Sequence, residues 1–195
     1  HALRGRDESA VRWLAAVEGA EHHGPLPDGS ASIGAWIAML RALLGRHGPA
    51  QMQTDAEAAI SELGAASPFR PLTQVLLAYA RLMAGDTDGA DAALAAAVES
   101  AVGGGAVYAG VVSLAQRALL AIERDDLVEA EAHVARAWSL VEDESLDDYA
   151  PTAILHAAAA HLALRKGDPA RARSSLVRAQ RLEPQLTRAI PWFAV

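Results

Sequence analysis

Cysteine is absent from this 195-residue chain, and no run of about 18 uncharged apolar residues occurs in it. Without cysteine the chain can form no disulfide and no thiolate site, and it lacks the commonest ligands of structural zinc. The first residues, His1 to Asp7, contain no apolar segment of the kind that signal peptides need. We therefore expect a cytoplasmic protein that neither crosses a membrane nor is secreted.

The chain also has few positive charges: 24 acidic residues outnumber 17 basic ones and give a formal net charge of −7. Binding to nucleic acid depends on clustered cations that neutralise phosphates, so we do not expect this chain to bind DNA by itself. Local basic exceptions are Arg165-Lys166 and a group of four arginines that recur at helical spacing beside alanine and leucine: Arg171, Arg173, Arg178 and Arg181. These four arginines predict a solvated helix face.

Aromatic residues make up only 5% of the chain, whereas hydrophobic residues reach 52%, largely through alanine. This composition favours closely packed helices over sheets and predicts an all-α fold. We expect residues 1–195 to form a single domain. The hydrophobic periodicity predicts helices near 7–19, 31–46, 51–63, 69–84, 87–102, 107–124, 127–142, 149–166, 169–182 and 187–195. Pro184 lies in the connection between the last two predicted helices.

Three loops between predicted helices share one pattern. They begin at Gly85-Asp86, Asp125-Asp126 and Gly167-Asp168, at intervals of 40 and 42 residues. Helical hairpin arrays have repeats of about 34 to 45 residues. The aspartate at the second loop position can accept hydrogen bonds from the free amides that open the next helix. The sequence therefore predicts three copies of a helix–turn–helix unit, with an aspartate in each turn that caps the second helix.

The helices around these loops repeat as well. The helix after each loop carries a small, a branched and a second small residue on one face: Ala90-Leu94-Ala97, Ala130-Val134-Ala137 and Ala172-Leu176-Ala179. The helix before each loop carries a small residue and, four positions later, a predicted core residue: Ala78-Leu82, Ala118-Ile122 and Ala160-Leu164. Small residues let helices approach closely, so both stripes predict packing seams. We also expect Trp13, Trp36 and Trp138 in the core.

The turn, the small-residue positions and Pro184 after Arg181-Leu182-Glu183 together resemble the tetratricopeptide repeat over nearly the whole chain. The resemblance implies an α-solenoid of antiparallel hairpins, a right-handed superhelix of about nine to ten helices. The long period departs from the usual pattern, as do Arg81, Ala121 and Ala163, which replace its tyrosine. In these departures the chain is similar to the degenerate repeats of MalT-like activators, which are LuxR-type regulators with a STAND nucleotide-switch domain.

That resemblance implies a transcriptional regulator in which a helical superhelix senses an inducer or a protein partner. The nucleotide switch would precede the superhelix, and a helix-turn-helix domain, absent here, would contact DNA. We accordingly expect the chain to be a fragment of a longer protein, with an incomplete repeat at each end. Trp192 and Phe193 would then be partly exposed, and the C-terminal end would offer a surface for self-association.

No motif for catalysis, metal binding or cofactor binding stands out. Gly103-Gly104-Gly105 is followed by no lysine, as a phosphate loop would require. His156 and His161 are five residues apart, which turns them about 140° from each other on a helix. The pair His22-His23 has no third ligand nearby, and the acidic runs fall in linkers. We expect no catalytic residue, no metal site and no cofactor.

Recognition is expected on the concave face, which the first helix of each pair lines in such superhelices. Candidate contacts follow the small alanine directly or lie one turn further on, with one added polar residue: Tyr79, Leu119, His161, Met83, Glu123, Arg165 and Gln116. In the alternative interpretation these residues bind nothing: Tyr79 and Leu119 belong to the core, and the charged Glu123 and Arg165 are solvated.

Three functions remain open from sequence. The leading interpretation is a sensing module of a LuxR/MalT-like regulator, which recognises an effector or partner and catalyses nothing. The second is a free-standing tetratricopeptide adaptor that binds peptides or proteins. The third, an α-helical enzyme, would need acids that converge in a closed polar pocket.

Overall fold

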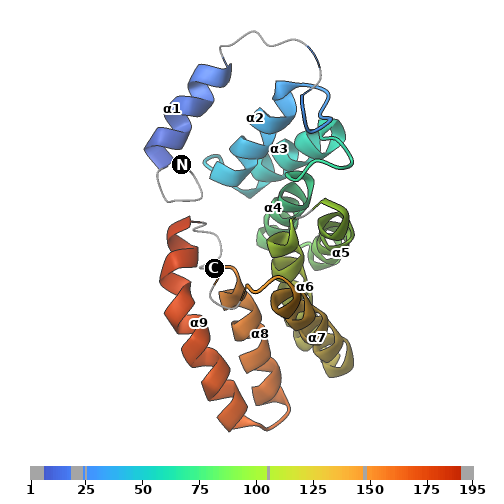
Figure 1. Ribbon diagram of the computed structural model, residues 1–195, viewed down its shortest axis with the longest axis vertical. Coiled ribbons are helices and arrows are strands. Elements are labelled where there is room, and N and C mark those ends of the chain that lie inside the picture. The colour runs from blue at the N-terminus through green and yellow to red at the C-terminus, as the bar shows by residue number, and fades with distance from the viewer. Residues whose placement is uncertain (1–6, 19–23, 25, 105, 147–148, 190–195) are drawn as a thin grey trace.

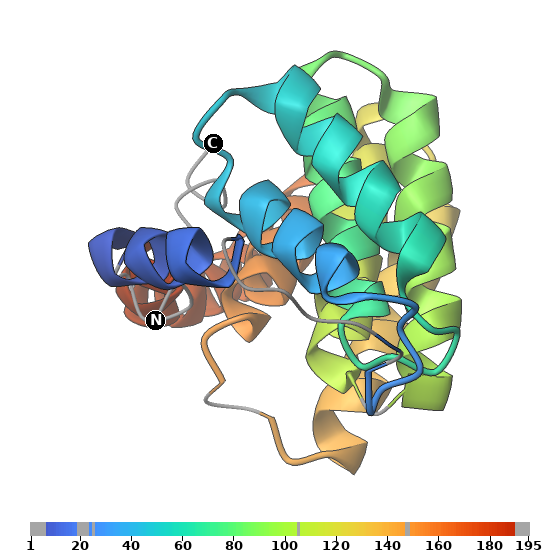
Figure 2. The same ribbon diagram turned by 90° about the horizontal axis from the view of Figure 1, so that it is seen from above.

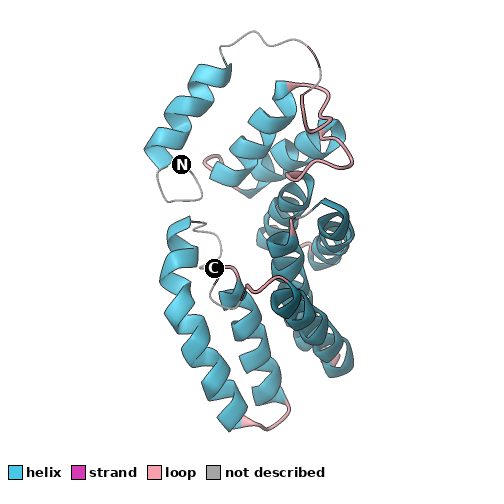
Figure 3. Ribbon diagram, viewed as in Figure 1, coloured by secondary structure: helices cyan, strands magenta, loops and turns pink. Residues whose placement is uncertain are grey.

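The computed structural model describes residues 7–18, 24, 26–104, 106–146 and 149–189, and all regular structure in these ranges is helical (Figure 3). Nine helices occur in the described part of the chain (Figure 1). They are α1 (Asp7–Glu18), α2 (Ile33–Leu44), α3 (Pro49–Glu62), α4 (Arg70–Met83), α5 (Thr87–Gly104), α6 (Val107–Glu123), α7 (Leu127–Asp143), α8 (Thr152–Arg165) and α9 (Pro169–Ala189). No helix within the described ranges is long and apolar enough to cross a membrane.

The helices pack as sequential antiparallel pairs, which confirms the predicted all-α stack of hairpins. The pairs are α2–α3, α4–α5, α6–α7 and α8–α9, and each pair packs on the one before it. Helix α1 packs less extensively, mainly against α2. Seen from the side and from above, α1 and α9 lie on the same side of the array (Figures 1 and 2). This arrangement is that of a helical repeat array.

The core is continuous along the array and lies at the predicted seams. All ten residues from Pro71 to Ala80 of α4 are buried, because α2, α3, α5 and α6 surround this helix. The predicted small residues Ala90, Ala130 and Ala118 are each 0% exposed. Alanine at these positions brings neighbouring backbones close and explains why so few aromatic residues are needed.

The three predicted turns have one conformation. Asp86, Asp126 and Asp168 each accept a hydrogen bond of 2.9 Å from the backbone N–H three residues later, which confirms the predicted helix caps. The backbone N–H of each aspartate donates to the carbonyl five residues earlier, at 2.8–2.9 Å. The residue before each aspartate is left-handed, with φ of 82°, 63° and 77° at Gly85, Asp125 and Gly167. Such a bond closes a helix C-terminus, so each turn ends one helix and caps the next.

A hydrogen-bonded centre holds the loop that precedes α2. The Asp28 carboxylate accepts bonds from the Ser30 hydroxyl at 2.7 Å, the Trp36 indole at 3.1 Å and the Ser67 hydroxyl at 2.5 Å. Gly64 lies against this loop so closely that an added Cβ would be 2.7 Å from the Asp28 carbonyl oxygen. The centre therefore joins the loop to α2 and to the segment between α3 and α4.

The predicted helix boundaries agree with those observed to within three residues, except at the C-terminal end. The prediction of a turn at Pro184 and a new helix from residue 187 is wrong, because α9 continues through Pro184 to Ala189. The residues beside Pro184 are good helix formers, and Leu182 is buried against α8, so the helix continues past the missing N–H.

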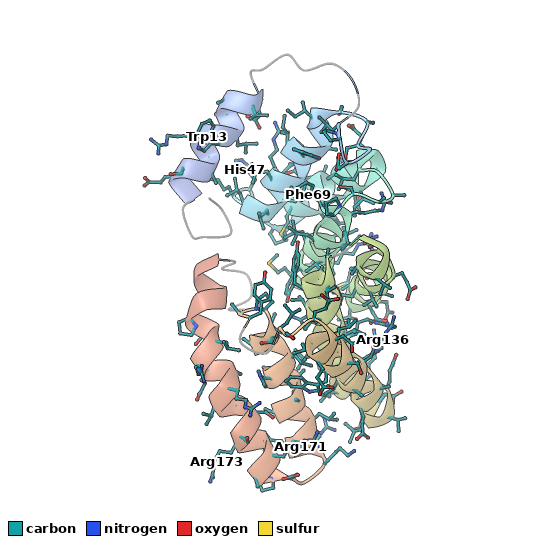
Figure 4. All side chains as sticks on the ribbon, viewed as in Figure 1. Trp13, His47, Phe69, Arg136, Arg171 and Arg173 are labelled. Atoms are coloured by element: carbon teal, nitrogen blue, oxygen red, sulfur yellow. The ribbon has the colours of Figure 1, made fainter. Side chains whose placement is uncertain are left out.

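Trp36 and Trp138 pack against the core as predicted, but three other core predictions are wrong. Trp13 is 62% exposed, since α1 buries Ala10 instead (Figure 4). Leu164 and Leu176 are 60% and 48% exposed, because no further helix among the described residues covers α8 and α9. The four arginines of α9 are all exposed, as predicted, but Arg171 and Arg173 line different clefts and do not share one face. Trp192, Phe193, His22 and His23 lie outside the described residues.

Candidate recognition surface

Two of the candidate contacts, Tyr79 and Gln116, are brought together inside the array. The Tyr79 side chain is 6% exposed, and its hydroxyl accepts a hydrogen bond of 2.5 Å from the Gln116 amide. Burial raises the pKa of the Tyr79 hydroxyl, and the bond from Gln116 opposes that rise only in part. The pair therefore links α4 to α6 within the core.

Three further candidates lie on α4 and α6, and they differ from one another in exposure to solvent. Leu119 is partly buried and packs against the main core. Met83 is 38% exposed at the end of α4, and Glu123 is exposed at the end of α6. Met83 and Glu123 are thus accessible near the turns that follow their helices, whereas Leu119 contributes to packing.

Arg165 joins α8 to the preceding hairpin. Its guanidinium donates to the backbone carbonyl of Ile122 at 3.2 Å and to the carboxylate of Asp125. The neighbouring Lys166 forms an ion pair of 2.7 Å with Glu131 of α7, and this cation lowers the pKa of that carboxyl. The end of α8 is therefore fixed to the α6–α7 hairpin by two adjacent cations, and the repeat pattern does not predict this role of Arg165.

His161 is exposed on α8 and lines a cleft of about 400 Å³ between α8 and α9. The cleft is almost entirely apolar, and Leu164 and Leu176 form much of its wall, with Arg173 contributing the charge. His156 lies elsewhere, buried with its ring 4.9 Å from that of Trp138. The two histidines therefore occupy different surroundings, as their spacing predicts.

Other clefts lie along the array at sites that contain none of the predicted contact residues. One of about 340 Å³ lies among α7, α8 and the start of α9, beside Trp138, Lys166 and Arg171. Another of about 400 Å³ lies between α1 and the α2–α3 hairpin, beside Arg46 and His47. These clefts form where helices of neighbouring hairpins pack against each other. The apolar periodicity of a single helix does not predict that packing.

The seven candidates do not form one pocket. Tyr79 and Gln116 meet in the core, Arg165 is held at a turn, and His161 lines the α8–α9 cleft. Among the described residues, no three His, Cys, Asp or Glu side chains are placed to hold a metal ion. The α8–α9 cleft is the place where a candidate residue, apolar surface and a charge coincide.

Comparison of the chain with protein-family models, curated proteins and solved structures finds no match. The family resemblance therefore rests on the residues of the repeat.

Proposed function

We propose that this chain is a non-catalytic recognition module, the effector- or partner-sensing helical repeat of a cytoplasmic LuxR/MalT-like transcriptional regulator. Binding to the array alters its curvature, and the altered curvature releases the switch domain of the parent protein. DNA is contacted only through a separate helix-turn-helix domain.

The observation that carries the proposal is the α8–α9 cleft. Leu164 and Leu176 are exposed there, although their counterparts Ile122 and Val134 in the preceding hairpin are 0% and 5% exposed. An exposed apolar cleft bounded by a few polar groups marks an interaction site. The regulator assignment comes from the resemblance of the repeats, and the cleft supports the recognition role.

The coding sequence on either side of this chain tests the regulator assignment. We expect a nucleotide-binding segment before the array and a helix-turn-helix segment after it. A parent gene that encodes neither segment contradicts the assignment, and peptide binding by such a protein would then favour the adaptor. A thermal-shift screen of sugars and metabolites complements this test, since a ligand bound only by the folded state raises the melting temperature.

A further inference from the structure

A second cleft lies between the last two hairpins, among α7, α8 and the first turn of α9. Its volume of about 340 Å³ falls at the lower end of the range for small-molecule sites. We call it the α7–α9 cleft. Trp138 and Leu162 contribute apolar surface to it, and Glu131, Lys166 and Arg171 contribute charge. Arg171 lies at the α8–α9 turn, at the opposite end of α9 from its last residue (Figure 4).

The same position is filled between the preceding hairpins. Between α3 and α5, Arg81 of α4 pairs with Glu57 of α3 at 3.3 Å and donates to a carbonyl in the first turn of α5 at 2.9 Å. Between α5 and α7, Arg117 of α6 pairs with Asp91 of α5 at 2.8 Å and lies 3.8 Å from Glu129 of α7. An arginine from the first helix of a hairpin thus bridges the second helices of two successive hairpins.

The α7–α9 cleft lacks this bridging arginine. Counted back from the equivalent turns, the counterparts of Arg81 and Arg117 in α8 are Ala163 and Ala159, and both alanines line the cleft. A methyl group fills far less space than an arginine side chain, and α7 and α9 do not pack closely on each other. The cleft is therefore open because of the residues that α8 carries.

A further hairpin in the array would leave this cleft uncovered. The α8 residues that line it are centred about 160° from those that line the α8–α9 cleft, given 100° per residue. A helix that followed α9 would pack on the second set, since the counterpart of Leu164, Ile122, is the residue buried beneath α8. In the filled groove between α5 and α7, the side chains of Arg117 and Glu129 stay 18% and 42% exposed although α8 and α9 follow. This side of the array therefore remains accessible.

The charges in the α7–α9 cleft favour an anion. Lys166 pairs with Glu131 at 2.7 Å, so these two charges balance each other. Asp168 accepts a hydrogen bond from the backbone N–H of Arg171 and caps α9. The Arg171 guanidinium forms no ion pair with any described residue, and Arg171 occupies the position of Glu129, which lies beside the bridging arginine of its own groove. The open cleft thus presents a cation where the filled groove presents a carboxylate.

We infer that the α7–α9 cleft binds a small organic carboxylate, an aromatic or aliphatic acid whose carboxylate pairs with Arg171 and whose apolar body lies against Trp138 and Leu162. Guanidinium and carboxylate groups pair in a specific, charge-assisted geometry. The ligand takes the place of the bridging arginine, with the charges reversed, and joins two hairpins by contacting α7, α8 and α9. The inference rests on the proposed sensing function for its role and names the class of effector.

Small carboxylates compared with their neutral amides test the inference. Benzoate, naphthoate and octanoate, each beside its primary amide, are titrated into the whole 195-residue chain, and isothermal titration calorimetry measures the dissociation constants. We expect at least one carboxylate to bind about tenfold more tightly than its amide, because the two differ in the charged group. Arg171→Glu should remove that preference. Ala159→Leu, which fills the cleft, should abolish binding.

Each variant has a matched control outside the cleft. Arg178→Glu changes another exposed arginine of α9, and Ala157→Leu adds the same bulk to the side of α8 that faces the α8–α9 cleft. Both controls should leave binding unchanged, and circular dichroism checks that every variant keeps its helices.

Three outcomes overturn the inference: no carboxylate binds, acid and amide bind equally, or Arg171→Glu has no effect on the preference. A fourth is binding that Ala157→Leu removes and Ala159→Leu does not, which would place the ligand in the α8–α9 cleft. Arg171 is exposed, so its replacement tests the charge even if Ala159→Leu disturbs the fold. The flanking-sequence test of the proposed function is independent of these results.

Discussion

Asp125 and Ser145 are the non-glycine residues with positive φ among those described, at 63° and 54°, and each ends a helix. A side chain in the left-handed region costs on the order of 1 kcal/mol relative to glycine. The carboxylate of Asp125 offsets this cost in part by binding Arg165. Ser145, in the turn after α7, must adopt the same left-handed backbone conformation.

We predict that Ser145→Gly stabilises the protein by up to about 1 kcal/mol, because glycine adopts this conformation without steric cost. Gly167→Ala is the matched control. An added Cβ at Gly167 meets nothing within 4 Å, but φ is 77°, so this change should destabilise the fold by about 1 kcal/mol. Urea denaturation measures both changes. A loss of stability in Ser145→Gly would contradict the argument.

Single residues were predictable where the interaction is local. The caps of Asp86, Asp126 and Asp168 were predicted because the acceptor and its amide are three residues apart. The bond from Arg165 to Asp125 was not predicted, since it spans 40 residues and depends on how two hairpins stack. Sequence could place Arg165 on a helix but could not identify its partner.

At the scale of elements, the loop before α2 depends on the ionised Asp28. Burial alone would raise the pKa of this carboxyl, but hydrogen bonds from Ser67, Ser30 and Trp36 outweigh that effect and lower the pKa from 3.8 to about 2. A pKa that is lower in the folded state contributes stability above pH 4, and this contribution is lost as the pH falls from about 4 to about 2.

We predict that Asp28→Asn lowers the free energy of unfolding by about 1 kcal/mol at pH 7, a value that allows for the partial exposure of Asp28. The difference between wild type and variant should shrink between pH 4 and pH 2. Chemical denaturation at several pH values measures it, and Asp88→Asn, at an exposed carboxylate paired with Arg124, is the control. A difference that stays constant down to pH 2 would show that Asp28 does not act through its charge.

Helix positions were largely predictable, because apolar spacing and turn residues depend only on residues that are close together in the sequence. The C-terminal end was the exception. Pro184 suggested a break, yet Leu182 remains buried and α9 continues to Ala189. Tertiary packing therefore overrode a strong local signal. The loop centre at Asp28 also escaped prediction, since Ser67 lies 39 residues away from it.

At the scale of the whole molecule, each hairpin is stabilised by its neighbours, and the inner hairpins have neighbours on both sides. Helix α4 is buried along ten consecutive residues, whereas α1 contacts mainly α2 and α9 packs mainly on α8. The stability of the array should therefore fall from its centre toward both ends.

We predict that the amides of α4 and α6 exchange with deuterium most slowly, and that those of α1 and the second half of α9 exchange fastest. Hydrogen–deuterium exchange followed by mass spectrometry measures the profile. Uniform protection from α1 to α9 would mean that the array unfolds as one unit and would contradict the prediction.

The periodicity identified which residues share a helix face, but not which neighbour covers that face. Tyr79 and His161 occupy equivalent positions, yet one is buried beside Gln116 and the other lines an open cleft. Their difference arises from place in the array, since α6 covers the first hairpin and no described helix covers the last. The open cleft between α8 and α9 therefore could not be distinguished from core by sequence.

The turns at Gly85, Asp125 and Gly167 share one geometry, so the segments between them are interchangeable at their joints. An in-frame duplication or deletion of one such segment rejoins the chain at a turn of the same form. The number of hairpins in a protein of this kind can thus change by whole units through gene duplication, while every joint keeps the conformation it already has.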